Sequence, residues 1–293
     1  MLIGIILSIV VAILWSLGEV SYSKMSKKYD KANVFMYTYL FRAIIYMLVV
    51  FLFKRTLYAS VELNTFLVIL PIILCDLFAS MVVNGAVFNG KLTVVSPIMA
   101  AYPVLDILFG FFLLNEGISK IQVALAVLIC LSIIILAMSQ KKSEHAPHPI
   151  KGIIFAIIYM LLVACSTFFE KTIYINDFSV YELYYYKGMV YTAVTVFFGM
   201  VVIISPVKMQ KPNFSIIKGN GLAPIGNIVY SFALQFGAMS IVATISSLYS
   251  VLTNIVSRVF LKEKINIKER VCIATIIVST FLLVLLGFIA WKI

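Results

Sequence analysis

The sequence predicts an all-α integral membrane protein, with ten transmembrane helices arranged as two inverted five-helix repeats. Three observations predict this fold: an apolar composition, ten apolar stretches of membrane-spanning length, and a second half that repeats the first. Hydrophobic residues make up 63% of the chain and charged residues 12%, and the mean hydropathy is +1.09. These values exclude a soluble globular domain and a disordered chain.

Each apolar stretch is about 20 residues long, which is enough to cross a hydrocarbon core of roughly 30 Å as a helix. Five stretches belong to a first repeat (residues 1–140) and five to a second (residues 152–293), with a polar linker at 141–151. Because each repeat has an odd number of spans, we expect the two repeats to have opposite orientations in the bilayer. The expected spans are 2–22, 34–53, 66–88, 93–114, 120–139, 152–172, 179–204, 217–239, 241–261 and 271–291.

The net charge of +11 does not indicate nucleic-acid binding, because most Lys and Arg residues lie in short loops, where they bias membrane orientation. The four cysteines fall within spans and lack metal-ligand spacing, so we expect neither a disulfide nor a metal site. Spans 120–139 and 271–291 carry no charged side chain between Ile121 and Ser139 or between Val271 and Trp291, which is typical of lipid-facing supports.

The internal repeat is clearest where Ser96–Gln122 aligns without a gap with Ala243–Glu269, 147 residues later, with seven identities. Gly90 and Gly237 keep the same offset. We interpret Glu116 and Glu263, an aligned pair, as structural residues at tight turns between helices.

A second repeated pattern places a basic residue between two tyrosines about halfway across span 34–53 and span 179–204. The spacing i, i+3, i+7 puts each trio on one helical face. A cation at this depth is costly, so each is expected to face a partner or a water-filled cavity, unless it belongs to an ion pair that only locks helices together. The trios are Tyr39, Arg42, Tyr46 and Tyr184, Lys187, Tyr191.

Candidate anionic partners lie in other spans. Asp76 and Asp106 lie near the middle of spans 66–88 and 93–114, and Glu19 lies near the end of the first span. Pro97 and Pro103 would weaken helical hydrogen bonding in span 93–114. Further uncharged candidates for the interior are Trp15, Tyr102, Asn227 and Tyr249.

The chain resembles a ten-span, EamA-type member of the drug/metabolite transporter superfamily. The resemblance covers essentially the whole chain and is carried, besides the repeat, by Trp15-Ser16, Ser96-Pro97, Ala101-Tyr102-Pro103-Val104, Leu113-Leu114-Asn115-Glu116 and Phe260-Leu261-Lys262-Glu263. The second repeat departs from the pattern, because Ser250 stands where Pro103 stands in the first.

The resemblance implies a cavity between spans 1–4 and 6–9 that opens alternately to each side, and proton-coupled export or exchange. Arg42 and Lys187 would then hold a carboxylate or phosphate, with the tyrosines donating hydrogen bonds or stacking. Asp76 or Asp106 would hold an amine or take up a proton, because burial favours the neutral carboxyl form, and Glu19 is a further coupling candidate. Two cations balanced by two anions favour a zwitterion such as an amino acid, or a related amine.

No enzyme signature is present: the chain has no P-loop and no plausible nucleophile–base–acid set, so we expect no catalytic activity and no cofactor. The expected partners are a small-molecule substrate, the lipid bilayer and protons. Whether the protein is a monomer or a homodimer stays open. The alternatives are a flippase for lipids or lipid-linked head groups and a non-transporting membrane sensor or scaffold.

The sequence gives two contradictory indications of the side of the membrane on which the termini lie. Fifteen Lys and Arg residues collect on the side of the first interhelical loop, and five on the side of the termini. The positive-inside rule therefore places both termini outside, whereas the resemblance implies cytoplasmic termini. The Ile- and Lys-rich composition favours a bacterial cytoplasmic membrane as the location.

Overall fold

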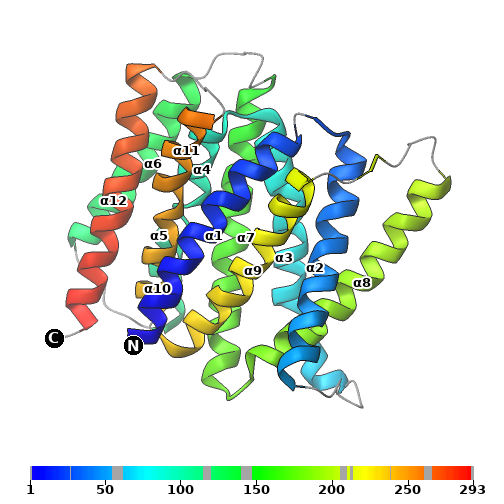
Figure 1. Cartoon of the computed structure of the whole chain (residues 1–293). Coiled ribbons are helices and arrows are strands. Elements are labelled where there is room, and N and C mark those ends of the chain that lie inside the picture. The colour runs from blue at the N-terminus through cyan, green and yellow to red at the C-terminus, as the bar shows by residue number, and fades with distance from the viewer. Residues whose placement is uncertain are drawn as a thin grey trace.

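The computed structural model describes residues 2–26, 28–54, 62–114, 120–139, 147–204, 210–211, 214–237, 239–260 and 266–291. These residues form only α-helices and no strands, which confirms the all-α class (Figure 1). The predicted turn residues Glu116 and Glu263 lie outside the described residues. The helices are α1 (Leu2–Ser26), α2 (Lys31–Lys54), α3 (Leu63–Asn89), α4 (Leu92–Met99), α5 (Pro103–Leu114), α6 (Lys120–Ser139), α7 (Pro149–Ile175), α8 (Val180–Ile204), α9 (Phe214–Phe236), α10 (Met239–Ser247), α11 (Tyr249–Phe260) and α12 (Ile267–Trp291).

Eight of the ten predicted spans correspond to single helices, and the other two are each divided into a helix pair, α4–α5 and α10–α11. Within the described residues, four segments are long and apolar enough to cross a membrane by length and composition. These segments are Leu2–Met25, Ala32–Leu52, Leu63–Asn89 and Pro149–Ile175.

The two divided spans correct the expectation of continuous helices at 93–114 and 241–261. In the first, Pro103 lacks an N–H and disfavours helical geometry at Tyr102, so the helix stops at Met99 and restarts at Pro103. In the second, no proline is present, yet the helix breaks at Leu248. There the Ser250 hydroxyl donates to the Ser247 carbonyl oxygen (3.2 Å), a local bond that competes with regular helix.

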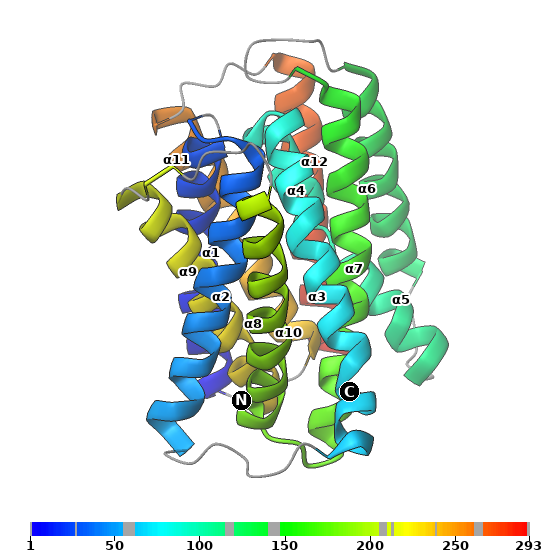
Figure 2. The same cartoon turned by 90° about the vertical axis from the view of Figure 1, so that its right-hand side faces the viewer.

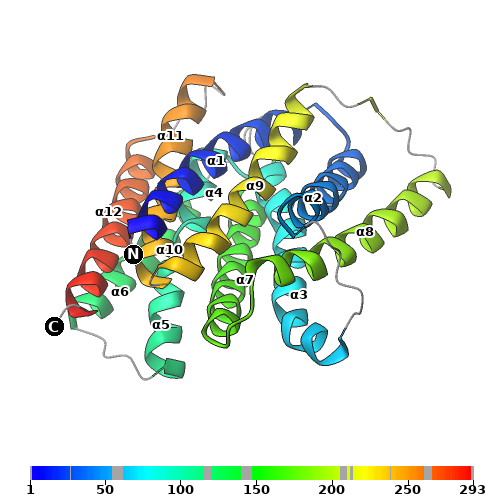
Figure 3. The same ribbon diagram turned by 60° about the horizontal axis from the view of Figure 1, so that its bottom comes forward.

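Helices from opposite repeats pack against each other. α1 lies along α9, and α7 lies along α3, which is the same contact seen from the other repeat (Figure 2). The remaining pairs, α2 with α8 and α6 with α12, join equivalent helices of the two repeats. Figure 3 shows α6 and α12 at one edge of the bundle and α8 at the other. Both termini lie at the same end of the molecule, as an even number of spans requires (Figure 1).

Glycines allow the paired helices to approach closely at both ends. A Cβ added to Gly4 would lie 3.0 Å from the Cα of Gly237, where α1 crosses α9. A Cβ added to Gly152 would lie 2.6 Å from the backbone nitrogen of Gly90, where α7 crosses α3. These two crossings occupy matching places in the two repeats, and only glycine leaves room for them.

Candidate functional site

A cavity of about 110 Å³ lies inside the bundle, between the α1–α9 pair on one side and the α3–α7 pair on the other. This volume can hold several water molecules. α2 and α8 also contribute lining residues, as does Tyr249 at the start of α11. The polar or aromatic lining residues are Trp15, Glu19, Tyr22, Thr38, Arg42, Asp76, Ser80, Tyr159, Ser166, Thr167, Glu170, Tyr184, Lys187, Asn220, Asn227, Tyr230, Ser231 and Tyr249.

The sequence-predicted site residues divide into two groups by their position. Eight of them line the cavity: Trp15, Glu19, Arg42, Asp76, Tyr184, Lys187, Asn227 and Tyr249. The other five do not, and these are Tyr39, Tyr46, Tyr102, Asp106 and Tyr191. The predicted wall of spans 1–4 and 6–9 also differs in one part, because α4 and α5 supply no residue to the described lining.

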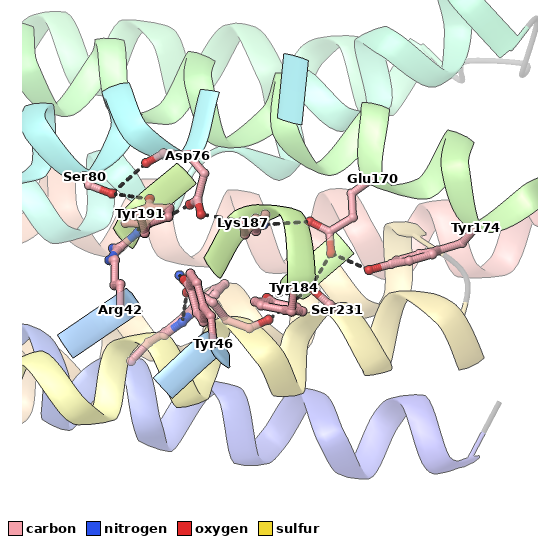
Figure 4. Close-up of polar contacts among 12 residues, drawn as sticks. Arg42, Tyr46, Asp76, Ser80, Glu170, Tyr174, Tyr184, Lys187, Tyr191 and Ser231 are labelled. Carbon is pink, nitrogen blue, oxygen red and sulfur yellow. Dashed lines mark hydrogen bonds and ion pairs between the residues drawn. The ribbon is translucent and has the colours of Figure 1, made fainter. Parts of the chain in front are cut away.

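Four charged side chains from four different helices form an alternating chain (Figure 4). Arg42 Nη1 on α2 lies 3.5 Å from Asp76 Oδ1 on α3, and Lys187 Nζ on α8 lies 3.6 Å from Asp76 Oδ2. Lys187 Nζ also lies 3.8 Å from Glu170 Oε2 on α7. The order is positive, negative, positive, negative, so this chain carries no net charge. We call Arg42, Asp76, Lys187 and Glu170 the four-charge chain.

Glu170 is a site residue that is absent from the sequence-predicted candidates. It lies five residues before the end of α7, and Lys187 lies seven residues after the start of α8. Because a short turn joins these antiparallel helices, similar distances from the turn mean similar depths, about 7.5 and 10.5 Å at 1.5 Å per residue. Counting from the turn is the signal that would have found Glu170 as a partner of Lys187.

Two of the predicted tyrosines, Tyr184 and Tyr191, contact the cations of the four-charge chain. Tyr191 accepts a hydrogen bond from Arg42 Nη1 (3.1 Å) and shares another with Ser80 Oγ (3.1 Å). Its ring lies 5.7 Å from the Arg42 guanidinium, within the range of a cation–π contact. Lys187 Nζ makes a similar contact with the Tyr184 ring at 5.1 Å. The tyrosines therefore fix the positions of both cations.

Glu170 is held by hydroxyl donors. Tyr174 donates a hydrogen bond to Glu170 Oε1 (2.8 Å), and Ser231 of α9 donates a short one to the same oxygen. Ser231 also shares a hydrogen bond with the Tyr184 hydroxyl (2.9 Å). These contacts join α7, α8 and α9 around one carboxylate (Figure 4).

Apart from Glu19, the α1–α9 wall is mainly amide and aromatic, and we call it the amide and aromatic wall. Trp15 Nε1 donates to Asn227 Oδ1 (2.9 Å), and Asn227 Nδ2 donates to the Tyr46 hydroxyl (3.2 Å) behind it. The Trp15 ring packs at 5.1 Å from the Tyr230 ring and edge-on at 5.6 Å from the Tyr249 ring. These rings give the wall flat apolar surfaces with fixed polar edges.

The remaining candidates do not line the cavity. Tyr39 stacks on Phe198 with parallel rings 5.5 Å apart, and its ring centroid lies 5.7 Å from that of Tyr191. Tyr102 donates its hydroxyl proton to the Ala243 carbonyl oxygen (3.0 Å). Asp106 is 5% exposed, and neither of its carboxyl oxygens has a hydrogen-bond partner among the described residues. Across the same part of the chain, no three His, Cys, Asp or Glu residues gather as a metal site requires.

The cavity extends along much of the length of the bundle. On α1 and α3 its lining reaches Tyr22 and Val87, close to the helix ends that lie opposite the termini. On α7 and α8 its lining reaches Glu170 and Tyr184, close to the turn that joins these two helices at the other end. The lining therefore approaches both ends of the bundle.

Comparison with known proteins agrees with this architecture. A sequence model of the EamA-like transporter family matches residues 2–138 and matches again over residues 150–285. A solved structure described only as "Crystal structure of protein" is similar over 97% of this chain and 96% of its own, with a TM-score of 0.65 and 12% identity. At that identity the likeness shows the fold alone. No curated protein matches.

Proposed function

Because the chain belongs to the EamA-like transporter family, we propose that it is a secondary active transporter of a small polar metabolite, with an amino acid or a related amine favoured. As a member of this family it is a multi-pass membrane transporter. The finer proposal is alternating access with proton-coupled export or exchange, in a bacterial cytoplasmic membrane. Its expected partners are the solute, protons and lipid.

The four-charge chain is the observation that carries the proposal for the substrate class. A solute carboxylate can replace the carboxylate contacts of Arg42 and Lys187, while a solute ammonium takes Asp76 or Glu170. A zwitterion adds no net charge to a site that has none. A multiply anionic sugar phosphate would leave an unbalanced charge in a poorly solvated interior, which is costly.

The amide and aromatic wall supports the same class. A solute held by its charged groups at the four-charge chain would place its remaining part against Trp15, Tyr230 and Tyr249. Aromatic faces accept both apolar groups and amines, the latter by cation–π contact. This wall therefore suits amino acids with apolar or cationic side chains.

The cavity between helices of both repeats supports alternating access. In transporters built from inverted repeats, the substrate site lies at the repeat interface, and access changes side when one repeat rocks against the other around that site.

The test is a thermal-shift screen of purified protein against amino acids, amines, nucleobases, sugar phosphates and lipid head groups. A ligand at 100 times its dissociation constant raises the stability by about 2.7 kcal/mol. We expect zwitterionic amino acids to stabilise the wild type and the control Lys151→Ala, an exposed position on α7, but not Arg42→Ala. Stabilisation only by lipid head groups would overturn the proposal in favour of a flippase. A protein that responds to no solute and transports none in liposomes would favour the sensor or scaffold.

The orientation proposal follows the charge count and places both termini outside. A reporter fused after Ile293 that is active only outside the cytoplasm would support it, and cytoplasmic reporter activity would contradict it.

A further inference from the structure

Glu19 of α1 is the one carboxyl group in the described cavity lining that pairs with no described cation. The other two carboxyl groups of the lining, Asp76 and Glu170, belong to the four-charge chain. Glu19 forms no ion pair with any residue that the structure describes. It accepts a hydrogen bond from the neutral hydroxyl of Ser96 on α4 (2.7 Å). The described lining therefore contains three carboxyl groups and two cations, and a zwitterion would leave this imbalance unchanged.

The other groups around Glu19 are also uncharged, and three of them are aromatic. Tyr249 and Thr253 of α11 lie beside its carboxyl group, and Tyr159 of α7 lies within electrostatic range of it. Trp15 precedes Glu19 by one turn of α1, so the two side chains lie on the same face of the helix. The Trp15 ring lies 5.6 Å from the Tyr249 ring. The Glu19 carboxyl group therefore meets the cavity among hydroxyl groups and aromatic rings.

The two cations of the cavity lining each have both a carboxylate and an aromatic ring as partners. The Arg42 guanidinium pairs with a carboxylate and lies 5.7 Å from the Tyr191 ring. The Lys187 ammonium pairs with two carboxylates and lies 5.1 Å from the Tyr184 ring. Glu19 brings the same two kinds of group together, and among the described residues none of the cations joins them. Its surroundings are therefore those of a site that can bind a cation.

Glu19 lies at a distance from the four-charge chain that a single solute can span. Glu19 is seven residues before the end of α1, and Arg42 is eleven residues after the start of α2, at the same end of the bundle. At 1.5 Å per residue, the two lie about 10.5 and 16.5 Å from that end, a difference of about 6 Å. Tyr159 is within electrostatic range of Glu19, Arg42 and Asp76, and the cavity joins all of these residues.

We propose that Glu19 forms a subsite for a cationic group of the solute, and that the favoured solute is an amino acid with a cationic side chain. The inference rests on the proposed function, in which the solute carboxylate and amino group bind the four-charge chain. The side chain then follows the amide and aromatic wall, and its terminal ammonium or guanidinium pairs with Glu19 against the Trp15 and Tyr249 rings. Such a solute carries one net positive charge, which balances the third carboxylate of the lining.

This role of Glu19 predicts discrimination between solutes of the same shape. An apolar side chain as long as that of lysine would occupy the same space but would leave the Glu19 carboxylate uncompensated. If Glu19 served only to take up a proton, its replacement would not change the relative affinities of these two solutes. The ratio of the two affinities therefore isolates the subsite.

The experiment measures the binding of L-lysine and L-norleucine to the purified full-length protein by titration calorimetry. Norleucine has the same chain of carbon atoms as lysine but lacks the side-chain ammonium. We expect the wild type to bind lysine roughly tenfold to a hundredfold more tightly, as for a hydrogen bond between charged groups. Glu19→Gln should remove most of this advantage, whereas its affinity for norleucine should change far less. Asp177→Asn removes a carboxylate at an exposed turn and should match the wild type with both solutes.

A measurement on the wild type alone covers the case in which Glu19→Gln fails to fold. The probe is 6-hydroxynorleucine, which carries a neutral hydroxyl in place of the lysine ammonium. We expect it to bind as weakly as norleucine. An affinity equal to that of lysine would show that the charge is not recognised, and would overturn the proposal.

The other outcomes separate this proposal from the proposed function. Equal affinities for lysine and norleucine, or a lysine advantage that persists in Glu19→Gln, would overturn the cation subsite. If both amino acids still lost their binding in Arg42→Ala, the proposed function would stand. n-Pentylamine has the lysine side chain without the amino-acid head group. Binding of n-pentylamine as tight as that of lysine and unchanged in Arg42→Ala would overturn the amino acid as the solute, and no binding of either amino acid would overturn both proposals.

Discussion

The two long walls of the cavity differ in chemistry although the repeat relates them. The α3–α7 wall carries both carboxylates of the four-charge chain, Asp76 and Glu170, whereas the α1–α9 wall carries Trp15, Asn227 and Tyr230, with Glu19 as its one carboxylate in the described lining. At the offset of 147 residues, Asp76 has Ala223 as its counterpart. The cations Arg42 and Lys187 lie on the paired helices α2 and α8 in the same pattern between two tyrosines, at an offset of 145 residues (187 − 42). The two repeats thus share the fold and the cation pattern but differ in where their carboxylates lie.

The largest effect is expected at Lys187, because it is the one cation that pairs with Glu170 among the described residues. Lys187→Ala leaves Asp76 with Arg42 alone and Glu170 with no cation among the described residues. Removing one partner of a buried ion pair costs about 3–5 kcal/mol, so we expect abolished transport and a clearly lowered unfolding temperature in a protein that still inserts. Proteoliposome uptake and thermal unfolding check this. Wild-type uptake would contradict the binding role.

Arg42→Ala should also abolish transport, with a smaller loss of stability, because Asp76 keeps Lys187. Arg42→Lys is the matched variant: it retains the charge but not the fixed geometry of the guanidinium toward Asp76 and Tyr191. We expect uptake in Arg42→Lys to lie between those of the wild type and Arg42→Ala. Equal uptake in both variants would show that charge at this position is irrelevant.

Asp76→Asn tests whether the Asp76 carboxylate takes up the coupled proton. The amide keeps the shape of the side chain but cannot ionise, so we expect solute exchange to persist while uptake driven by a pH gradient is lost. Counterflow measures solute exchange, and uptake under an imposed pH gradient measures proton coupling. Both can be measured in the same liposomes. Unchanged gradient-driven uptake would place coupling elsewhere.

The smallest effect is expected on the amide and aromatic wall. Trp15→Phe keeps the ring but removes the hydrogen bond to Asn227 Oδ1. A single neutral hydrogen bond contributes about 0.5–1.5 kcal/mol, so we expect affinity to fall by a factor of roughly 2 to 13 with the maximal transport rate little changed. A loss as large as that of Arg42→Ala would mean that the two walls contribute equally to binding.

Much of the fold could be predicted from sequence, because span length, apolar composition and the repeat are local or periodic signals. The break before α11 could not, because Ser250 offers no signal as strong as Pro103. The sequence indicates how deep a residue lies in its span better than it indicates which way its side chain points. Asp106 lies in the first turn of α5, and the rotation of this helix directs it toward α7 near Cys165 and not into the cavity. Such a rotation depends on packing between helices distant in sequence.

The exchange of partners between repeats has a consequence for how the chain assembles. Since α1 packs on α9 and α3 on α7, neither repeat contains the helices that cover its own polar faces. A single repeat released alone into the bilayer would leave Arg42 and Asp76, or Lys187 and Glu170, facing lipid. The repeat is thus the unit of the sequence but not the unit of folding. Two halves expressed as separate chains should accumulate only when they are produced together, because each half supplies helices that the other needs.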